Sequence, residues 1–165
     1  MTSIGRSAFQ GCSGLTSVAI PDSVTSIGVA VFYGCSGLTS VEIPNSVTNI
    51  AEFMFKDCTK LMNVTIGNSV TSIGNSAFEN CSGLTEVIIP NGVTDIGIYA
   101  FEKCSNLTDI TLGNGVTRIG YSAFRNCINL ENVYITDLAN WCNISLEDSE
   151  SNPLCHATKL YLNGT

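Results

Sequence analysis

Apolar residues return along this chain at a fixed interval of 23 positions. One phenylalanine column occupies positions 9, 32, 55, 78, 101 and 124, and one cysteine column occupies positions 12, 35, 58, 81, 104 and 127. A sequence period of 20 to 50 residues is typical of a solenoid, in which each unit buries its apolar side chains only against its neighbours. The pattern therefore predicts a stacked array and not a closed globule.

The first half of each repeat reads L-x-x-V-x-I, as at Leu84, Val87 and Ile89. Apolar residues that alternate with exposed ones have the period of a half-buried strand, and successive strands of this kind are expected to stack into a parallel sheet. A pair such as Pro90-Asn91 then turns the chain out of the strand. We expect the Asx residues of this column to stack as a polar ladder, at positions 22, 45, 68, 91, 114 and 137.

The second half of each repeat contains V-T-x-I-G, a bend or short extended piece, and then x-x-A-F-x-x-C, which is long enough for one helical or 3-10 turn. Glycines at 28, 74, 97 and 120 are expected to supply positive φ, and Ala51 interrupts their column. Strands lie about 4.8 Å apart, whereas packed helical turns lie about 8 to 10 Å apart. The predicted fold is an α/β solenoid that curves, with the parallel sheet on the concave side and the short turns on the convex side.

The period holds through residues 1–135, beginning with a partial repeat, and fails in residues 136–165. That last segment predicts an irregular longer coil with a short helix near Asp137 to Cys142, a solvated acidic loop at Glu147, Asp148 and Glu150, and a strand at Lys159 to Leu162. Met1 occupies a position that is valine in the later repeats. We therefore expect the chain to be part of a longer repeat protein.

The full pattern L-x-x-V-x-I-P-x-x-V-x-x-I-G-x-x-A-F-x-x-C resembles the BspA-like, or Treponema-type, leucine-rich repeat over residues 1 to about 135. The commoner leucine-rich repeat has asparagine nine positions into the unit, where this chain has serine or glycine. The resemblance implies a surface-exposed or secreted protein that adheres to host matrix proteins or to other cells. It also implies that longer coils such as D-L-A-x-W-C-N-I interrupt the array.

The charge balance narrows the classes of partner that the chain could bind. Its 14 acidic residues outnumber 7 basic ones and give a formal net charge of -7. This sign repels phosphate backbones and anionic lipid, so we expect no nucleic acid partner. No apolar run approaches the roughly 18 residues of a membrane span. The family resemblance implies instead a protein ligand.

Candidate chemistry is sparse. The cysteine column suggests reduced core thiols, with disulfides between coils or a metal as the alternatives, and Cys142 and Cys155 lie off the column, where they could pair. His156 is the only histidine and lacks the arrangement of a cysteine protease. The acidic loop lacks the order of a calcium-binding loop. We therefore predict no catalytic residue, no metal and no cofactor.

The side chains that alternate with the buried ones form the candidate binding site. They should face outward on the concave sheet in two columns. The residues predicted to bind a ligand are Glu42, Asn63, Thr65, Glu86, Ile88, Asp109, Thr111, Asn132 and Tyr134. The leading hypothesis is a non-catalytic protein-interaction module. The competing one is a structural spacer or assembly scaffold, for which end-to-end self-association through apolar ends is an option.

Overall fold

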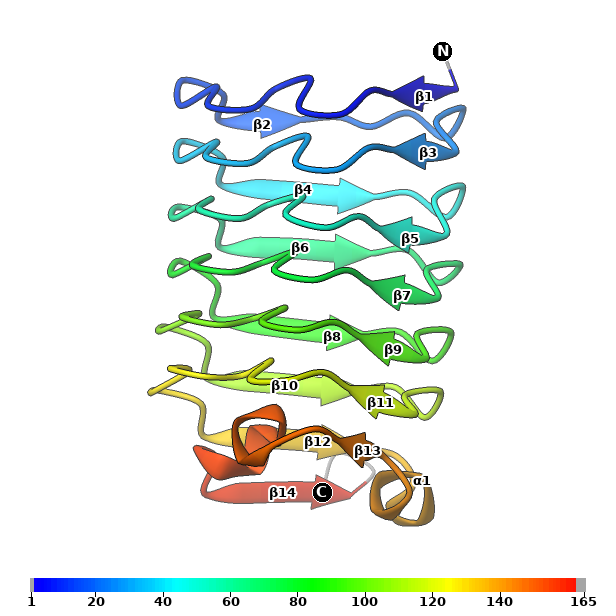
Figure 1. The fold of residues 1–165 in the computed structure, drawn as a ribbon, viewed down its shortest axis with the longest axis vertical. Coiled ribbons are helices and arrows are strands. Elements are labelled where there is room, and N and C mark those ends of the chain that lie inside the picture. The colour runs from blue at the N-terminus through cyan, green and yellow to red at the C-terminus, as the bar shows by residue number, and fades with distance from the viewer. Residues whose placement is uncertain (1, 163–165) are drawn as a thin grey trace.

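The computed structural model describes residues 2–162 as one stack of coils with a column of parallel strands on each of two sides (Figure 1). One side, whose strands are four residues long except for β2, is the face that we call the open face: β2 (Ser17–Val18), β4 (Ser40–Ile43), β6 (Asn63–Ile66), β8 (Glu86–Ile89), β10 (Asp109–Leu112), β12 (Asn132–Ile135) and β14 (Lys159–Leu162). The shorter strands are β1 (Ser3–Ile4), β3 (Ser26–Ile27), β5 (Asn49–Ile50), β7 (Ser72–Ile73), β9 (Asp95–Ile96), β11 (Arg118–Ile119) and β13 (Ser145–Leu146). Every strand pair is parallel. The predicted repeat solenoid is confirmed.

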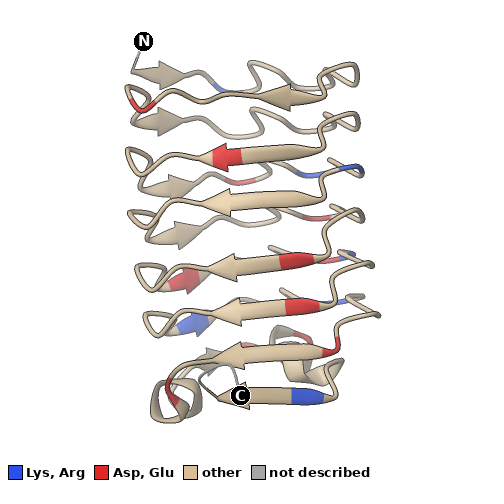
Figure 2. Ribbon diagram, turned by 180° about the vertical axis from the view of Figure 1, so that it is seen from behind, with Lys and Arg blue, Asp and Glu red and all other residues tan. Residues whose placement is uncertain are grey.

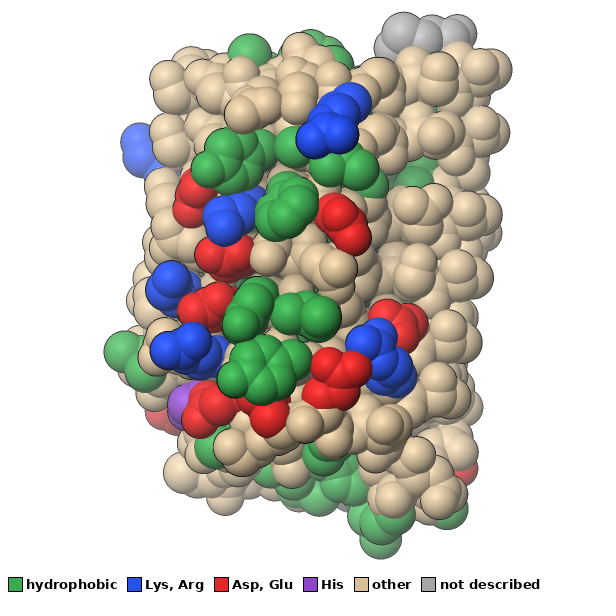
Figure 3. All heavy atoms as spheres, in the orientation of Figure 1, with side chains coloured by type: hydrophobic (Ala, Val, Ile, Leu, Met, Phe, Trp, Pro, Cys, Tyr) green, Lys and Arg blue, Asp and Glu red, His purple; other side chains and the backbone are tan. Residues whose placement is uncertain are grey.

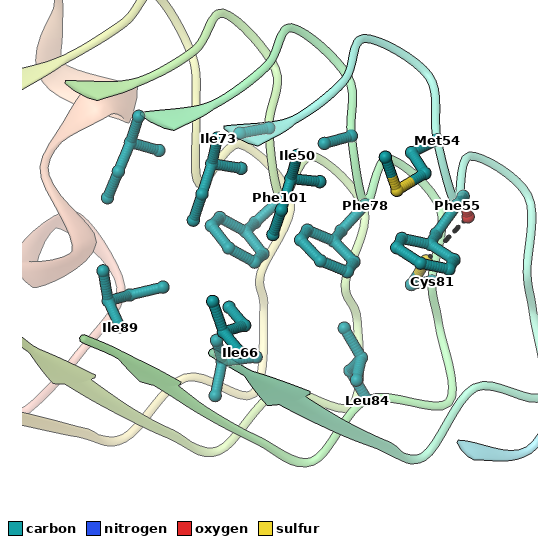
Figure 4. Close-up of a cluster of buried hydrophobic side chains, with 14 of the residues drawn as sticks. Ile50, Met54, Phe55, Ile66, Ile73, Phe78, Cys81, Leu84, Ile89 and Phe101 are labelled. Atoms are coloured by element: carbon teal, nitrogen blue, oxygen red, sulfur yellow. Dashed lines mark hydrogen bonds between the residues drawn. The ribbon is translucent and has the colours of Figure 1, made fainter. Parts of the chain in front are cut away.

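The inward columns fill a continuous core (Figure 4). Phe32, Phe55, Phe78, Phe101 and Phe124 are all 0% exposed, and successive rings of the column stack with centroids 5.3 to 5.5 Å apart. This distance is only slightly more than the strand spacing. The expected 8 to 10 Å separation of packed helical turns is therefore wrong, and little difference in spacing between the two sides remains to bend the array.

The A-F-x-x-C segments explain the short spacing, because they form stacked turns and not helices. The Phe78 amide, for example, donates to the Ala100 carbonyl of the next coil at 2.8 Å. Such bonds between coils take the place of bonds within a helix. In the described part of the chain, helical turns occur only after the repeats, in α1 (Leu138–Cys142), η1 (Ser149–Ser151) and η2 (Pro153–Cys155).

Positive φ is supplied by other residues than the predicted glycines. Among the described glycines only Gly11 and Gly34 have it, whereas Phe53 and Tyr99 adopt φ of 56° in the turns. The predicted glycine column has a different role: a Cβ on Gly74 would lie 2.7 Å from the Glu52 nitrogen of the preceding coil. These glycines are needed because neighbouring backbones approach closely.

Both faces of the stack contain an interruption in strand pairing. The short-strand side divides between β3 and β5, and the open face divides between β6 and β8. The first interruption coincides with Ala51, which carries a Cβ in the column where close approach requires glycine. The second coincides with Pro90, whose column contains Gly67 and Gly113 in coils that pair fully with their predecessors.

The last coil contains the predicted helix and strand, but the acidic loop is not simply solvated. Asp137 caps α1 by accepting from two amides. Asp148 accepts from the Ser122 amide and hydroxyl at 2.9 and 2.8 Å, and Glu147 accepts from Arg118. In a regular coil the amide equivalent to that of Ser122 donates to a carbonyl of the next coil, as Tyr99 does to Tyr121. Asp148 therefore replaces a backbone acceptor where the repeat ends.

Candidate functional site

The predicted outward columns lie on the open face. In β4 and β8 exposed and buried residues alternate, and in β10 and β12 the outward residues are half-buried. The sheet therefore presents all nine predicted residues outward, and whether they bind a ligand stays a prediction. Figure 2 shows acidic residues on β4, β8 and β10 of this face, with a basic residue only on β14.

Asp109 organises the part of this face near β14. Its carboxylate accepts from the Asn132 amide at 2.9 Å and from the Tyr134 hydroxyl at 3.2 Å. Partial burial raises the pKa of the Asp109 carboxyl, but these two bonds, one from Thr108 and the charge of Lys159 outweigh that effect and lower the pKa. The site therefore holds a fixed negative charge.

A tyrosine pair continues from this carboxylate. The rings of Tyr134 and Tyr161 stack with centroids 4.8 Å apart and an interplanar angle of 13°. Tyr161 and Lys159 extend the two outward columns onto β14, with Lys159 in register with Asn132. The sequence predicted this strand but did not include its residues in the site, because the 23-residue spacing no longer holds across the last coil.

Ile88 stands apart on β8 as the most exposed apolar side chain of the open face, at 56%. With Glu86 it borders an open hollow of about 270 Å³ at the interruption between β6 and β8, which Asn63 and Thr65 also line. Glu42 lies at two further hollows nearer β2. The predicted residues therefore separate into a hydrogen-bonded group around Asp109 and Tyr134 at one end and a hollowed region with Glu42, Glu86 and Ile88 at the other.

The turn side carries aromatic residues that the sequence reasoning missed as surface features. Figure 3 shows hydrophobic side chains gathered there between charged ones. Tyr121 is 47% exposed and contacts Tyr99 edge to face, with ring centroids 5.8 Å apart. The Lys56 ammonium lies 5.8 Å from the centroid of Phe53. We call Phe53, Lys56, Tyr99 and Tyr121 the aromatic turn surface.

The cysteine column lies in the core, as predicted. Its first member, Cys12, is the exception, because it is exposed. The Cys81 thiol donates to the Phe55 carbonyl at 3.1 Å (Figure 4), and burial raises the pKa of Cys58 and of Cys127 to about 12. With the stacked phenylalanine rings about 5 Å apart, distance alone does not prevent a disulfide between adjacent coils. All eight cysteines are free, including Cys142 and Cys155.

The lone histidine does not activate a nucleophile in this structure. His156 Nε2 lies 3.1 Å from Glu150, and the Cys155 sulfur contacts the same carboxylate at 3.7 Å. Burial and the Glu150 charge raise the pKa of Cys155, which opposes thiolate formation. Within residues 2–162 no cluster of metal-ligating side chains occurs, and no helix has the length and apolar character needed to cross a membrane.

Comparison with known proteins identifies relatives of the repeats. Residues 2–131 match the family model described as BspA type leucine rich repeat region, in six copies. The chain is similar to the leucine-rich repeat protein of T. pallidum, with 32% identity, a TM-score of 0.73 and coverage of 80% of this chain and 62% of that one. It is also similar to a leucine-rich repeat protein from Bacteroides ovatus, with 32% identity, a TM-score of 0.76 and coverage of 98% and 39%.

The pneumococcal vaccine antigen PcpA shares the fold, with a TM-score of 0.64 at 22% identity and coverage of 84% of this chain and 32% of that one. No curated protein sequence matches the chain. The chain spans less than two thirds of the length of either of the first two solved relatives.

Proposed function

This chain belongs to the BspA-type leucine-rich repeat family, and on that premise we propose that it is a non-catalytic adhesion module, displayed at a cell surface or secreted, which binds host matrix or cell-surface proteins through its open face. Proteins with leucine-rich repeats are generally protein-interaction modules. The proposal adds the surface, the partner class and the location to that general role.

The observation that carries the proposal is the ordered tyrosine cluster on the open face. Tyr134 is stacked on Tyr161 and hydrogen-bonded to Asp109, so its ring is held in place before any partner arrives. The core does not need these rings, because the inward residues of β12 are buried without them. Tyrosine is enriched among interface residues that dominate binding energy, and an ordered ring loses little conformational entropy on binding.

The test compares binding of the fluorescently labelled protein to cultured host cells and to surfaces coated with extracellular-matrix proteins. Tyr134→Ala and Ile88→Asp should each weaken binding by roughly 1 to 2 kcal/mol, which is about 5- to 30-fold, while the melting temperature changes little. Tyr121→Ala on the aromatic turn surface is the matched control and should bind like the parent. The open-face proposal fails if Tyr121→Ala abolishes binding while both open-face variants retain it.

A structural spacer or assembly scaffold is the alternative role, and the same experiment separates the two. Side chains that only keep coils soluble contribute little to any interface, so a spacer would bind no cells or matrix proteins above background. Absence of binding by the parent protein on every surface would therefore refute adhesion.

A further inference from the structure

Two outward columns of side chains run next to each other across β8, β10 and β12 on the open face. The register of the paired strands places Glu86, Asp109 and Asn132 in the first column and Ile88, Thr111 and Tyr134 in the second. These strands pair over four residues each, so the regular spacing of about 4.8 Å between paired strands holds here. The neighbours of each outward side chain therefore follow from the register.

Two carboxylates lie side by side in the first column. Glu86 is in register with Asp109 on the adjacent strand, and like charges in such positions repel each other. Among the described residues neither carboxylate forms an ion pair. Three side chains donate to the Asp109 carboxylate, which has about four acceptor positions. The pair can therefore accept further hydrogen bonds, and a cation beside it would relieve the repulsion.

One face of the Tyr134 ring is left uncovered by its own column. The ring stacks on Tyr161 of β14, and β12 lies between β14 and β10, so the other face of the ring is directed towards β10. The residue of this column on β10 is Thr111, whose short side chain does not reach the outer part of a tyrosine ring. Tyr134 is accordingly only half-buried.

Both carboxylates act on this ring. Asp109 Oδ1 accepts a hydrogen bond from the Tyr134 hydroxyl at 3.2 Å. Partial burial and this bond raise the pKa of Tyr134, and the negative charge of Glu86 adds to the effect. The acidic pair therefore lies beside the ring whose face is uncovered.

The position over Thr111 on the open face suits a planar group. Tyr134 borders it on one side, and Ile88, which is 56% exposed, borders it on the other. Because adjacent paired strands lie about 4.8 Å apart, a group over Thr111 would lie about that far from the Tyr134 ring. The rings of Tyr134 and Tyr161 stack at the same 4.8 Å. A flat group in this position would therefore continue the stack.

Charge and shape together select the group. An aromatic ring would stack but would leave both carboxylates without a cation, and a lysine ammonium would pair with them but is not planar. An arginine guanidinium is planar and positively charged and carries five N–H donors, so it can stack on a tyrosine and donate to two carboxylates at once. Its methylene groups can pack on Ile88.

We propose that this position binds an arginine side chain of a partner protein, with the guanidinium lying on the uncovered face of Tyr134 and donating hydrogen bonds to Glu86 and Asp109. The proposal rests on the proposed function, because it names the side chain that a protein partner would place on the open face. Complementary charge across such a contact favours the correct partner and disfavours acidic ones.

A nuclear magnetic resonance titration of the isotope-labelled full chain with single amino-acid probes tests the site. Nα-acetyl-arginine amide should shift the backbone amide signals of Thr111 and Tyr134. The lysine analogue, charged but not planar, and the citrulline analogue, planar but uncharged, should each bind at least about fivefold more weakly. Equal binding of the lysine probe overturns the stacking argument, and equal binding of the citrulline probe overturns the charge argument. Absence of shifts with the arginine probe overturns the site.

Three variants locate the binding. Thr111→Tyr would place a third ring on Tyr134 and fill the position without removing either carboxylate, so it should abolish binding of the arginine probe. Glu86→Gln should weaken binding about fivefold. Asp22→Asn, an exposed residue outside both columns, is the matched control and should bind like the parent. Retained binding by Thr111→Tyr, or equal losses in the two charge variants, overturns the proposal; melting temperatures confirm that each variant is folded.

Chemically modified matrix proteins extend the test to a partner. Coated matrix proteins treated with phenylglyoxal, which modifies arginine, should bind the labelled chain at least about fivefold more weakly, whereas acetylation of their lysines should have little effect. On the arginine-modified coat Glu86→Gln should bind like the parent, because the two changes remove the same contact. A further loss in Glu86→Gln on that coat would show that this carboxylate binds another group.

The same measurements separate failure of this inference from failure of the proposed function. If arginine modification leaves binding unchanged, the inference is wrong, and the proposed function stands if Tyr134→Ala still reduces binding to matrix. If the parent binds no cells or matrix proteins, the proposed function fails, and the probe titration decides whether the arginine site exists.

Discussion

Replacing a ring in the middle of the phenylalanine column should cost far more stability than replacing the ring at its first position. Phe78 is fully buried and stacks on Phe55 and Phe101 at 5.3 Å on either side. Phe9 is 36% exposed and stacks on Phe32 alone, at 5.4 Å. The comparison therefore changes burial and the number of stacked neighbours while the chemistry of the substitution stays the same.

The magnitudes follow from these contacts. Truncating a fully buried phenylalanine to alanine costs about 3 to 5 kcal/mol, because the transfer free energy is lost and a cavity remains. For Phe78→Ala we expect the upper half of that range, since a void between two stacked rings is closed only if the coils shift. For Phe9→Ala we expect about 1 to 2 kcal/mol, because part of the ring is already in water and one side has no ring to lose.

Equilibrium unfolding in urea, followed by circular dichroism, measures both values. The stability of a repeat array is approximately the sum of repeat and nearest-neighbour terms, so Phe78→Ala should also broaden the transition by weakening coupling between the two halves. Equal losses at the two positions would show that the array does not behave as a chain of nearest-neighbour contacts.

Three further predictions address other parts of the chain. An alkylating reagent at pH 8 should label only Cys12, Cys142 and Cys155 in the native protein and all eight cysteines after denaturation. Mass spectrometry would identify the labelled residues. Labelling of the other five cysteines in the native protein would contradict their assignment to the core. Asp148→Asn should cost about 1 to 2 kcal/mol in thermal unfolding, because the Ser122 amide and hydroxyl lose a charged acceptor. Burial raises the pKa of Asp148, but hydrogen bonds from Ser151 and Ser122 outweigh that effect and lower the pKa in the folded protein. The carboxylate therefore contributes to stability above pH 3.8, and this contribution is lost as the pH falls through the folded pKa. An acid unfolding curve of Asp148→Asn that matches the parent's would contradict this. Gly115→Ala should destabilise the fold by more than about 2 kcal/mol, because its Cβ would collide with the Asn91 carbonyl oxygen. Gly14→Ala should be nearly neutral, because its Cβ would meet no atom within 4 Å. Chemical denaturation of both variants would measure the difference.

The fold was predictable because the information for it repeats within each coil. Alternation in each repeat's first half identifies which side chains enter the core, so Val87 and Glu86 could be assigned to opposite faces of the sheet from their positions in the repeat. The same logic placed the candidate site on the open face.

Features that depend on the distance between coils were not predictable from one repeat. The role of Gly74 is set by the Glu52 backbone of the preceding coil, and no local pattern contains that distance. Phe53 and Tyr99 adopt positive φ against their own preference, because the stacked turns hold them in this conformation. The interruption between β6 and β8 was missed for the same reason: Pro90 was interpreted as a turn residue, whereas it coincides with the loss of strand pairing to β6.

Different columns of the repeat determine which side chains enter the core and how neighbouring coils contact each other. This separation has a physical consequence for the open face. The inward columns must keep their size, since a ring such as Phe78 contacts rings on both sides. The outward columns touch only neighbours across the face and vary freely among Ser40, Asn63 and Glu86. The proline or glycine column stands between these extremes, because strand pairing on the open face is interrupted at Pro90 while the phenylalanine stack behind stays at 5.3 to 5.5 Å. An array of this kind can therefore change strand pairing on its open face at a single position in each coil without repacking its core.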